Sequence, residues 1–274
     1  MQTMRFQVVQ PTGFLRNYVK NYCFMESTSF EGDVIERVIP VENIQLMFHY
    51  KNPFVVHQLN NVTVKQPHSI VSGLNDTFSD VSTNGETGVV FVSFYPTGAC
   101  NFFDFPLSEI ENQSIDMQDV FGSEIRRIEE MLVCSRTLSE KVNIVENFLI
   151  NRFSPIPQHD SLMIKKGLEI VKSRKGQIDA ITLSECLSIS SKTLERKFSQ
   201  YLGKTTKQVI KLVRFNEVLM DISCNKKHSI TEYAYKNGYF DQAHFIRDFK
   251  AYSGYTPKEF VAKYPDFSIS IEDC

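Results

Sequence analysis

The sequence has no tryptophan, no long apolar run and no secretion signal. None of its apolar stretches approaches the roughly 20 residues of a membrane span, and the N-terminus lacks the basic-then-apolar pattern of a signal peptide. Its 274 residues suffice for about two ordinary domains, each with its own core. We therefore expect a soluble, cytoplasmic protein with no membrane partner.

The sequence also lacks the patterns of a metal or catalytic site. Its six cysteines are scattered without a CxxC pair, so neither a disulfide framework nor a zinc site is indicated. There is no glycine-rich phosphate loop, nucleophile elbow or paired-carboxylate signature. His49, His57 and His68 lie near predicted strands, but no HxH or HxxxE pattern surrounds them. We expect no metal, no cofactor and no enzymatic activity.

Charge is divided unevenly along the chain, although the net charge is only −2. Residues 160–264 carry 19 Lys and Arg against 11 Asp and Glu, whereas residues 1–159 carry 11 against 18. The last ten residues add a net −3. A basic half joined to an acidic half is typical of a protein in which only one half meets a polyanion.

The acidic half has the pattern of an α+β domain. An i, i+3, i+4 pattern from Phe14 to Tyr22 predicts a short helix, and Asn84-Gly85 is the best candidate for a tight hairpin turn. Later helices are predicted around 125–132 and from the capping box Thr137–Glu140 to about Phe153. Between them, runs of β-forming residues predict a mainly antiparallel sheet or small barrel with strands at 37–39, 44–49, 54–56, 62–64, 69–71 and 88–95.

The basic half is predicted to be all helical. The segment 154–160, with two prolines, is the expected linker from the domain of residues 1–153 to that of 161–264, and 265–274 form an acidic tail. Ser161 is expected to cap the first helix, and a capping box from Thr182 to Glu185 the second. A third helix, predicted over 191–202 after the cap Ser190, completes a helix-turn-helix.

This unit occurs twice. A second capping box runs from Ser229 to Glu232, and residues 207–222 predict one continuous helix between the two units. The two helix-turn-helix units are therefore expected to be held in a fixed relation by a rigid spacer. Adding 51 maps Ser190, Leu194, Arg196, Phe198, Tyr201, Gly203 and Thr205 onto Asp241, Phe245, Arg247, Phe249, Tyr252, Gly254 and Thr256.

The second unit closely resembles the signature of the AraC/XylS family of bacterial transcription regulators. The run 238–250, GYFDQAHFIRDFK, and the run 254–260, GYTPKEF, carry this resemblance. Less specifically, Ile39-Pro40, residues 44–48 and residues 94–99 resemble the N-terminal domain of a subset of these regulators. The resemblance implies a sensory or oligomerisation domain followed by a DNA-binding domain, and it names no effector.

The resemblance also implies which residues meet DNA. Arg and Gln have the donor and acceptor geometry that matches base edges, and hydroxyls or cations at helix ends suit phosphates. An ion pair of each Arg with Glu195 or Asp248 is the competing interpretation. Base contacts are expected at Lys192, Thr193, Glu195, Arg196, Gln242, Ala243 and Arg247, and phosphate contacts at Ser190, Thr205, Lys250 and Thr256.

We therefore predict a sequence-specific, ligand-sensing DNA-binding transcription regulator, controlled by an effector or by self-association through its N-terminal domain. Operator DNA is the expected partner, and RNA polymerase, a small-molecule effector and a homodimer partner stay open. Two alternatives remain at this stage. One is a metal or small-molecule enzyme domain fused to a DNA-targeting module, and the other is a helical protein-interaction module.

Overall fold

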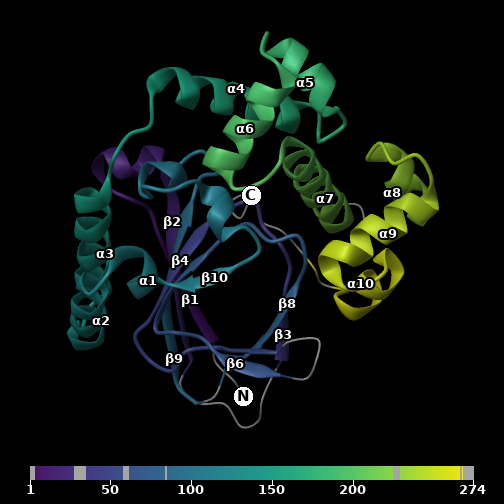
Figure 1. Ribbon diagram of the computed structural model, residues 1–274. Helices are drawn as coiled ribbons and strands as arrows, with labels where there is room; N and C mark the ends of the chain where they lie inside the picture. The colour runs from purple at the N-terminus through teal and green to yellow at the C-terminus, as the bar shows by residue number, and fades with distance from the viewer. Residues whose placement is uncertain are drawn as a thin grey trace.

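The computed structural model describes residues 4–27, 35–57, 62–83, 85–224, 229–265 and 267. Its N-terminal part contains two antiparallel sheets, with helices beside them and the remaining helices above and to the right (Figure 1). The first sheet has the spatial order β1 (Met4–Val9), β2 (Val19–Ser27), β9 (Thr87–Phe94), β4 (Gln45–His49), β7 (Ser69–Ser72) and β10 (Ser114–Asp116). The second has the order β3 (Ile35–Val38), β8 (Ser79–Ser82), β5 (Val55–His57) and β6 (Thr63–Lys65).

The first sheet is covered on both faces. Successive side chains of a strand point to opposite faces, so in β4 Leu46 and Phe48 share one face while Gln45 and Met47 share the other. Phe48 packs edge-on against Phe148, which brings the sheet against the helical layer. That layer and its connections comprise η1 (Gly13–Asn17), η2 (Ala99–Asn101), η3 (Leu107–Ile110), α1 (Met117–Phe121), α2 (Glu124–Cys134) and α3 (Leu138–Arg152).

The expected helix from Phe14 to Tyr22 is wrong. A short 3-10 turn, η1, ends at Asn17, and the chain then enters the nine-residue strand β2. A register shift between Val19 and Asn21 in the pairing of β2 with β9 explains the misleading pattern. Because a bulge adds one residue, Val19 and Tyr22 both become fully buried although they are three residues apart.

The predicted strands and the capping box of the N-terminal half are confirmed, whereas four further strands were not predicted. Each of the six predicted strands overlaps an observed one, and the predicted capping box of Thr137 and Glu140 is present at α3. Strands β1, β2, β8 and β10 were not anticipated. A tight hairpin turn was predicted at Asn84-Gly85, and Asn84 lies outside the described residues. The strands on either side of this turn, β8 and β9, belong to different sheets. This connection therefore crosses between sheets.

The C-terminal helices form two matching units around a long helix. These helices are α4 (Gln158–Ser173), α5 (Ala180–Cys186), α6 (Ser191–Leu202), α7 (Thr206–Cys224), α8 (Ile230–Lys236), α9 (Gln242–Ser253) and α10 (Pro257–Lys263). As predicted, Ser190 and Asp241 cap α6 and α9, and both helices have 12 residues. Each ends at a glycine in the left-handed conformation, Gly203 and Gly254. The spacer α7 has 19 residues, which at 1.5 Å per residue is roughly 28 Å.

Two predicted helix starts are wrong by a few residues. Helix α4 begins at Gln158, directly after Pro157, rather than after Ser161. Helix α5 begins at Ala180, because the side chain of Asp179 accepts the backbone N–H of Thr182. Thr182 is therefore inside the helix and does not cap it. In the described part of the chain, no helix is long and apolar enough to cross a membrane.

Both helix-turn-helix units contact the N-terminal domain at the ends of their second helices. A Cβ atom at Gly203 would lie 2.9 Å from the backbone oxygen of Leu107 in η3. One at Gly254 would overlap the side chains of Arg37 and Phe78, on β3 and just before β8. The two glycines correspond at the offset of 51, so equivalent points of the repeat dock on the same domain.

Gly203→Ala should lower the free energy of unfolding by about 2–4 kcal/mol, because it combines a left-handed backbone with an overlap at Leu107. Gly13→Ala is the control, since Gly13 has a φ of +54° but no atom within 4 Å of the added Cβ. It should cost only about 1–2 kcal/mol. Urea denaturation of both variants measures the difference, and equal costs would contradict the close docking at Gly203.

Candidate nucleic-acid interface

Helix α6 has one buried and one exposed face. Leu194 and Phe198 are fully buried in the core. On the other face Lys192, Glu195 and Arg196 are exposed, and Thr193 is half-buried. The amphipathic pattern thus fixes the helix by its apolar side and leaves polar side chains along its length facing outward.

Helix α9 repeats this arrangement. Phe245 and Phe249 are fully buried and pack against each other with ring centroids 5.8 Å apart. Gln242, Ala243 and Arg247 are exposed. The predicted base-contacting residues of each unit therefore lie together on the outer side of its second helix.

The two arginines of these faces are free of ion pairs. Within the described ranges, neither Arg196 nor Arg247 forms a salt bridge, so the competing interpretation as surface ion pairs does not hold here. Asp248, the expected partner of Arg247, instead lies 3.4 Å from both Lys211 Nζ and His244 Nε2. The guanidinium groups retain their full donor capacity for a ligand.

Three of the predicted base-contacting side chains have protein partners, and one of them is the hydroxyl of Thr193, which lies 2.9 Å from Ser190 Oγ. A carboxylate oxygen of Glu195 accepts the backbone N–H of Thr206 at 3.1 Å, at the start of α7. The side-chain oxygen of Gln242 accepts the hydroxyl of Thr231 at 3.2 Å, which leaves its two amide hydrogens available.

Three of the predicted phosphate-contacting hydroxyls are helix caps. Ser190 accepts the N–H of Thr193, and Thr256 that of Glu259. Thr205 both accepts the N–H of Gln208 and donates to its side-chain oxygen at 2.6 Å. These hydroxyls mark the N-termini of α6, α7 and α10, where free N–H groups favour anions. Lys250 is exposed.

An unpredicted feature is the buried ammonium group of Lys204, directly after Gly203. Only 1% of its side chain is exposed. Its Nζ lies 2.8 Å from Asp76 Oδ2, 3.0 Å from Glu111 Oε1 and 2.9 Å from Asn112 Oδ1, all in the N-terminal domain. Gln208 of α7 donates to the same two carboxylates. We call Lys204 with Asp76, Glu111 and Asn112 the lysine clasp.

The second unit has a corresponding contact of different chemistry. Arg37 of β3 lies between the rings of Phe78 and Tyr255, 3.8 Å and 4.3 Å from their centroids. Its guanidinium also donates two 2.7 Å hydrogen bonds to Asp80 of β8, and these bonds lower the pKa of that carboxyl. Tyr255 follows Gly254 as Lys204 follows Gly203. We call Arg37, Asp80, Phe78 and Tyr255 the arginine stack.

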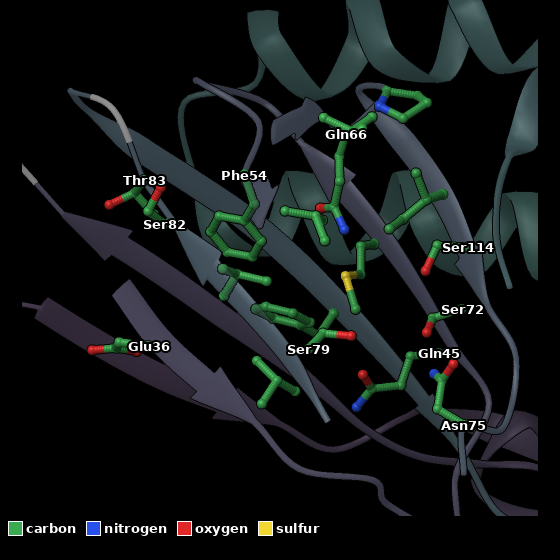
Figure 2. A pocket seen from close by; sticks show the side chains of 18 of the residues that line it. Glu36, Gln45, Phe54, Gln66, Ser72, Asn75, Ser79, Ser82, Thr83 and Ser114 are labelled. Atoms are coloured by element: carbon green, nitrogen blue, oxygen red, sulfur yellow. The ribbon is translucent and has the colours of Figure 1, made fainter. Parts of the chain in front are cut away.

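A cavity of about 550 Å³ lies between the two sheets, within the size range of small-molecule sites. Its walls include Met47 and Phe91 of the first sheet and Val56 and Val81 of the second. Figure 2 shows polar side chains gathered at one end, among them Gln45 and Asn75, and Thr83 at the other. The cavity therefore has an apolar middle and polar ends.

The three strand histidines have different surroundings, and both ring nitrogens of His49 are buried without a partner among the described residues. Burial lowers the pKa of His49 to about 4, so this ring is neutral at pH 7. His57 Nε2 lies 2.7 Å from the hydroxyl of Ser82, and His68 Nδ1 lies 3.1 Å from the backbone oxygen of His49. Across the described ranges, no three His, Cys, Asp or Glu side chains are grouped as metal ligands.

Comparison with known proteins connects this geometry to two domain families. A helix-turn-helix domain profile matches residues 183–263, and a profile described as a domain of unknown function, DUF6597, matches residues 7–116. No protein with a curated description matches the sequence. The helix-turn-helix match spans α5 to α10, which includes the exposed faces of α6 and α9.

Solved structures give distant likenesses. ToxT from Vibrio cholerae, in a structure with a bound unsaturated fatty acid, has a TM-score of 0.46 and 10% identity, over 98% of each chain. The C-terminal domain of AraT, a response regulator from Geobacillus stearothermophilus, has a TM-score of 0.35 and 20% identity, over 40% of this chain and 88% of that one. The AraC-like transcriptional activator CuxR has a TM-score of 0.30 and 11% identity, over 80% and 87%.

The domain match and the paired helix-turn-helix units agree with each other over the same residues. The C-terminal part of the chain, residues 183–263, is an AraC-type helix-turn-helix domain.

Proposed function

We propose that α6 and α9 each enter a major-groove segment of operator DNA and read its bases. Arg196 and Arg247 are assigned to guanine edges, and the free amide hydrogens of Gln242 to an acceptor on adenine. Lys192, Thr193 and Ala243 complete the reading faces. Glu195, which is held by the N–H of Thr206, contributes a carboxylate whose position is fixed before DNA arrives.

The single observation that carries this proposal is the pair of exposed arginines at equivalent positions of the repeat, neither of which forms a salt bridge with the described residues. An exposed guanidinium without an ion pair keeps its five N–H donors available to an incoming acceptor. Two of them, 51 residues apart on corresponding caps and cores, suit two similar sites on one ligand. Duplex DNA presents such sites in successive turns of its major groove.

We also propose that the N-terminal domain controls DNA binding through an effector in the cavity. The lysine clasp and the arginine stack hold the C-terminal ends of the two reading helices, and both lie next to residues that line the cavity. A ligand that changes either contact changes how the helices are presented. Phosphate contacts by Ser190, Thr205, Lys250 and Thr256, self-association and contact with RNA polymerase stay predictions.

Arg196→Ala and Arg247→Ala should each weaken binding to the preferred operator by about 10- to 100-fold, because each removes one forked contact. The operator is first selected from a random duplex pool with the unmodified protein. Fluorescence anisotropy at several salt concentrations then measures affinity for that operator and for random duplex. Arg136→Ala is the control, since Arg136 is exposed in the N-terminal domain and carries the same charge. Equal affinity of the unmodified protein for operator and random duplex would refute sequence-specific binding.

Lys204→Met should lower the free energy of unfolding by about 1–3 kcal/mol, because two carboxylates lose hydrogen bonds from a buried ammonium. Lys207→Met is the matched control, since Lys207 is exposed on α7 and should change it by less than about 0.5 kcal/mol. Limited proteolysis between residues 153 and 158 reports whether the domains separate. Unchanged cleavage in Lys204→Met would show that the clasp does not hold them together.

A further inference from the structure

The strand register builds one continuous polar row across the cavity floor. Ser93 of β9 pairs with Gln45 of β4, which pairs with Ser72 of β7, which pairs with Ser114 of β10. Two residues further along β4, Met47 pairs with Phe91 and Ile70. Gln45, Ser72 and Ser114 line the cavity, as do Met47, Phe91 and Ile70. The floor therefore changes from polar to apolar within one step along the strands (Figure 2).

The polar end of the cavity offers acceptors and donors, because each amide keeps a second N–H and Ser72 and Ser114 carry hydroxyls. The amide nitrogen of Gln45 donates to Ser93 Oγ at 3.2 Å, and that of Asn75 donates to the backbone oxygen of Gly73 at 3.0 Å. Among the described residues, neither amide oxygen receives a hydrogen bond. At the other end of the cavity, the buried hydroxyl of Thr83 also has no partner within the described part of the chain. Buried polar groups are normally paired, so the hydroxyl of Thr83 points to a ligand or to water.

The cavity lining also lacks positive charge. Among its described residues, Glu36 is the sole ionisable side chain. Lys204 lies beside the lining residue Asn112, but its Nζ contacts Asn112 Oδ1 and two carboxylates and is engaged in the clasp. A carboxylate or phosphate in this cavity would lose its hydration without meeting a cation of the described lining, and it would share the cavity with Glu36.

We infer that the cavity binds an uncharged molecule with an apolar body and a head group that donates hydrogen bonds to Gln45 and Asn75. The apolar body lies against Met47, Phe91 and Val56, and the head reaches the polar row. An anion is disfavoured because no cation is among the described lining residues, and an ammonium ion because no carboxylate is among the described lining residues at that end of the cavity. This inference rests on the proposed sensory role of the N-terminal domain.

The cavity is connected to both interdomain contacts. Asn75 lines it and precedes Asp76 of the lysine clasp, and Asn112 belongs to both the lining and the clasp. On the second sheet, Glu36 and Val38 face the cavity while Arg37, between them, enters the arginine stack. Ser79 and Val81 flank Asp80 in the same way. A ligand on one face of β3 and β8 therefore acts directly on the strands that hold α9.

The test compares eight-carbon molecules that differ in the head group alone. Octanamide, octanoate and octylammonium are titrated into the full chain by isothermal calorimetry at pH 7. We expect octanamide to bind at least about tenfold more tightly than either ion. Equal or tighter binding of octanoate would overturn the inference, and so would tighter binding of octylammonium or the absence of binding by octanamide.

Gln45→Lys places a cation in the middle of the polar row. This variant should bind octanoate at least about tenfold better than the unmodified protein and should lose affinity for octanamide. Gln7→Lys is the control, since Gln7 is exposed and points to the opposite face of β1 from the lining residue Phe6. An unchanged preference in Gln45→Lys, with the thermal transition preserved, would place the bound head group elsewhere and overturn the assignment.

Calorimetry measures ligand binding in the absence of DNA. The proposed ligand class and the proposed DNA-binding function can therefore be refuted independently of each other. Octanamide binding by a chain that does not distinguish operator from random duplex would refute the regulatory function and leave the ligand class standing. Specific operator binding with no preference for octanamide would refute the ligand class alone.

Discussion

The burial of Lys204 is the constraint on which the relation of the two domains depends. An ammonium group taken out of water loses several kcal/mol of hydration unless its hydrogens find acceptors. Asp76, Glu111 and Asn112 supply these, and all three belong to the other domain. Since the group has no such partners within α6 or α7, separation of the domains requires the ammonium and two carboxylates to be rehydrated together. Docking is therefore specific for one arrangement of charges.

The repeat of the helix-turn-helix unit explains why the C-terminal helices contact the N-terminal domain at two places, the lysine clasp and the arginine stack. Lys204 and Tyr255 each follow the glycine that ends a reading helix, so duplication of the unit placed two equivalent side chains toward the N-terminal domain. Their chemistry has diverged: one is a charge held by carboxylates, and the other is a ring stacked on Arg37. Because α7 is a continuous helix, fixing both ends of the pair also fixes the relation of α6 to α9. The N-terminal domain thus positions both α6 and α9, and not only one of the two helix-turn-helix units.

Sequence patterns predicted the helical half better than the sheets, for a physical reason. Helix caps and the 3.6-residue period are local, so Ser190, Asp241 and the two terminal glycines could be identified directly. Tyr22 could not be placed, because its burial depends on a bulge defined by pairing with β9. The polar row likewise exists through the pairing of Gln45 with Ser93 and Ser72, which are far apart in the chain. A buried lysine gives no sequence signal either, since Lys is ordinarily exposed.

The free energy of the contacts between the two domains determines how much binding free energy the proposed effector has to supply. The arginine stack consists of a partly exposed ion pair and two cation–π contacts, each worth about 0.5–2 kcal/mol. A ligand shifts the balance between docked and released states only by its difference in affinity for them, and tenfold corresponds to about 1.4 kcal/mol. Since β3 and β8 carry the cavity lining on one face and Arg37 and Asp80 on the other, a small displacement of these strands is sufficient to weaken a contact of that size. Control of the second unit thus requires a ligand of moderate selectivity and no rearrangement of the core.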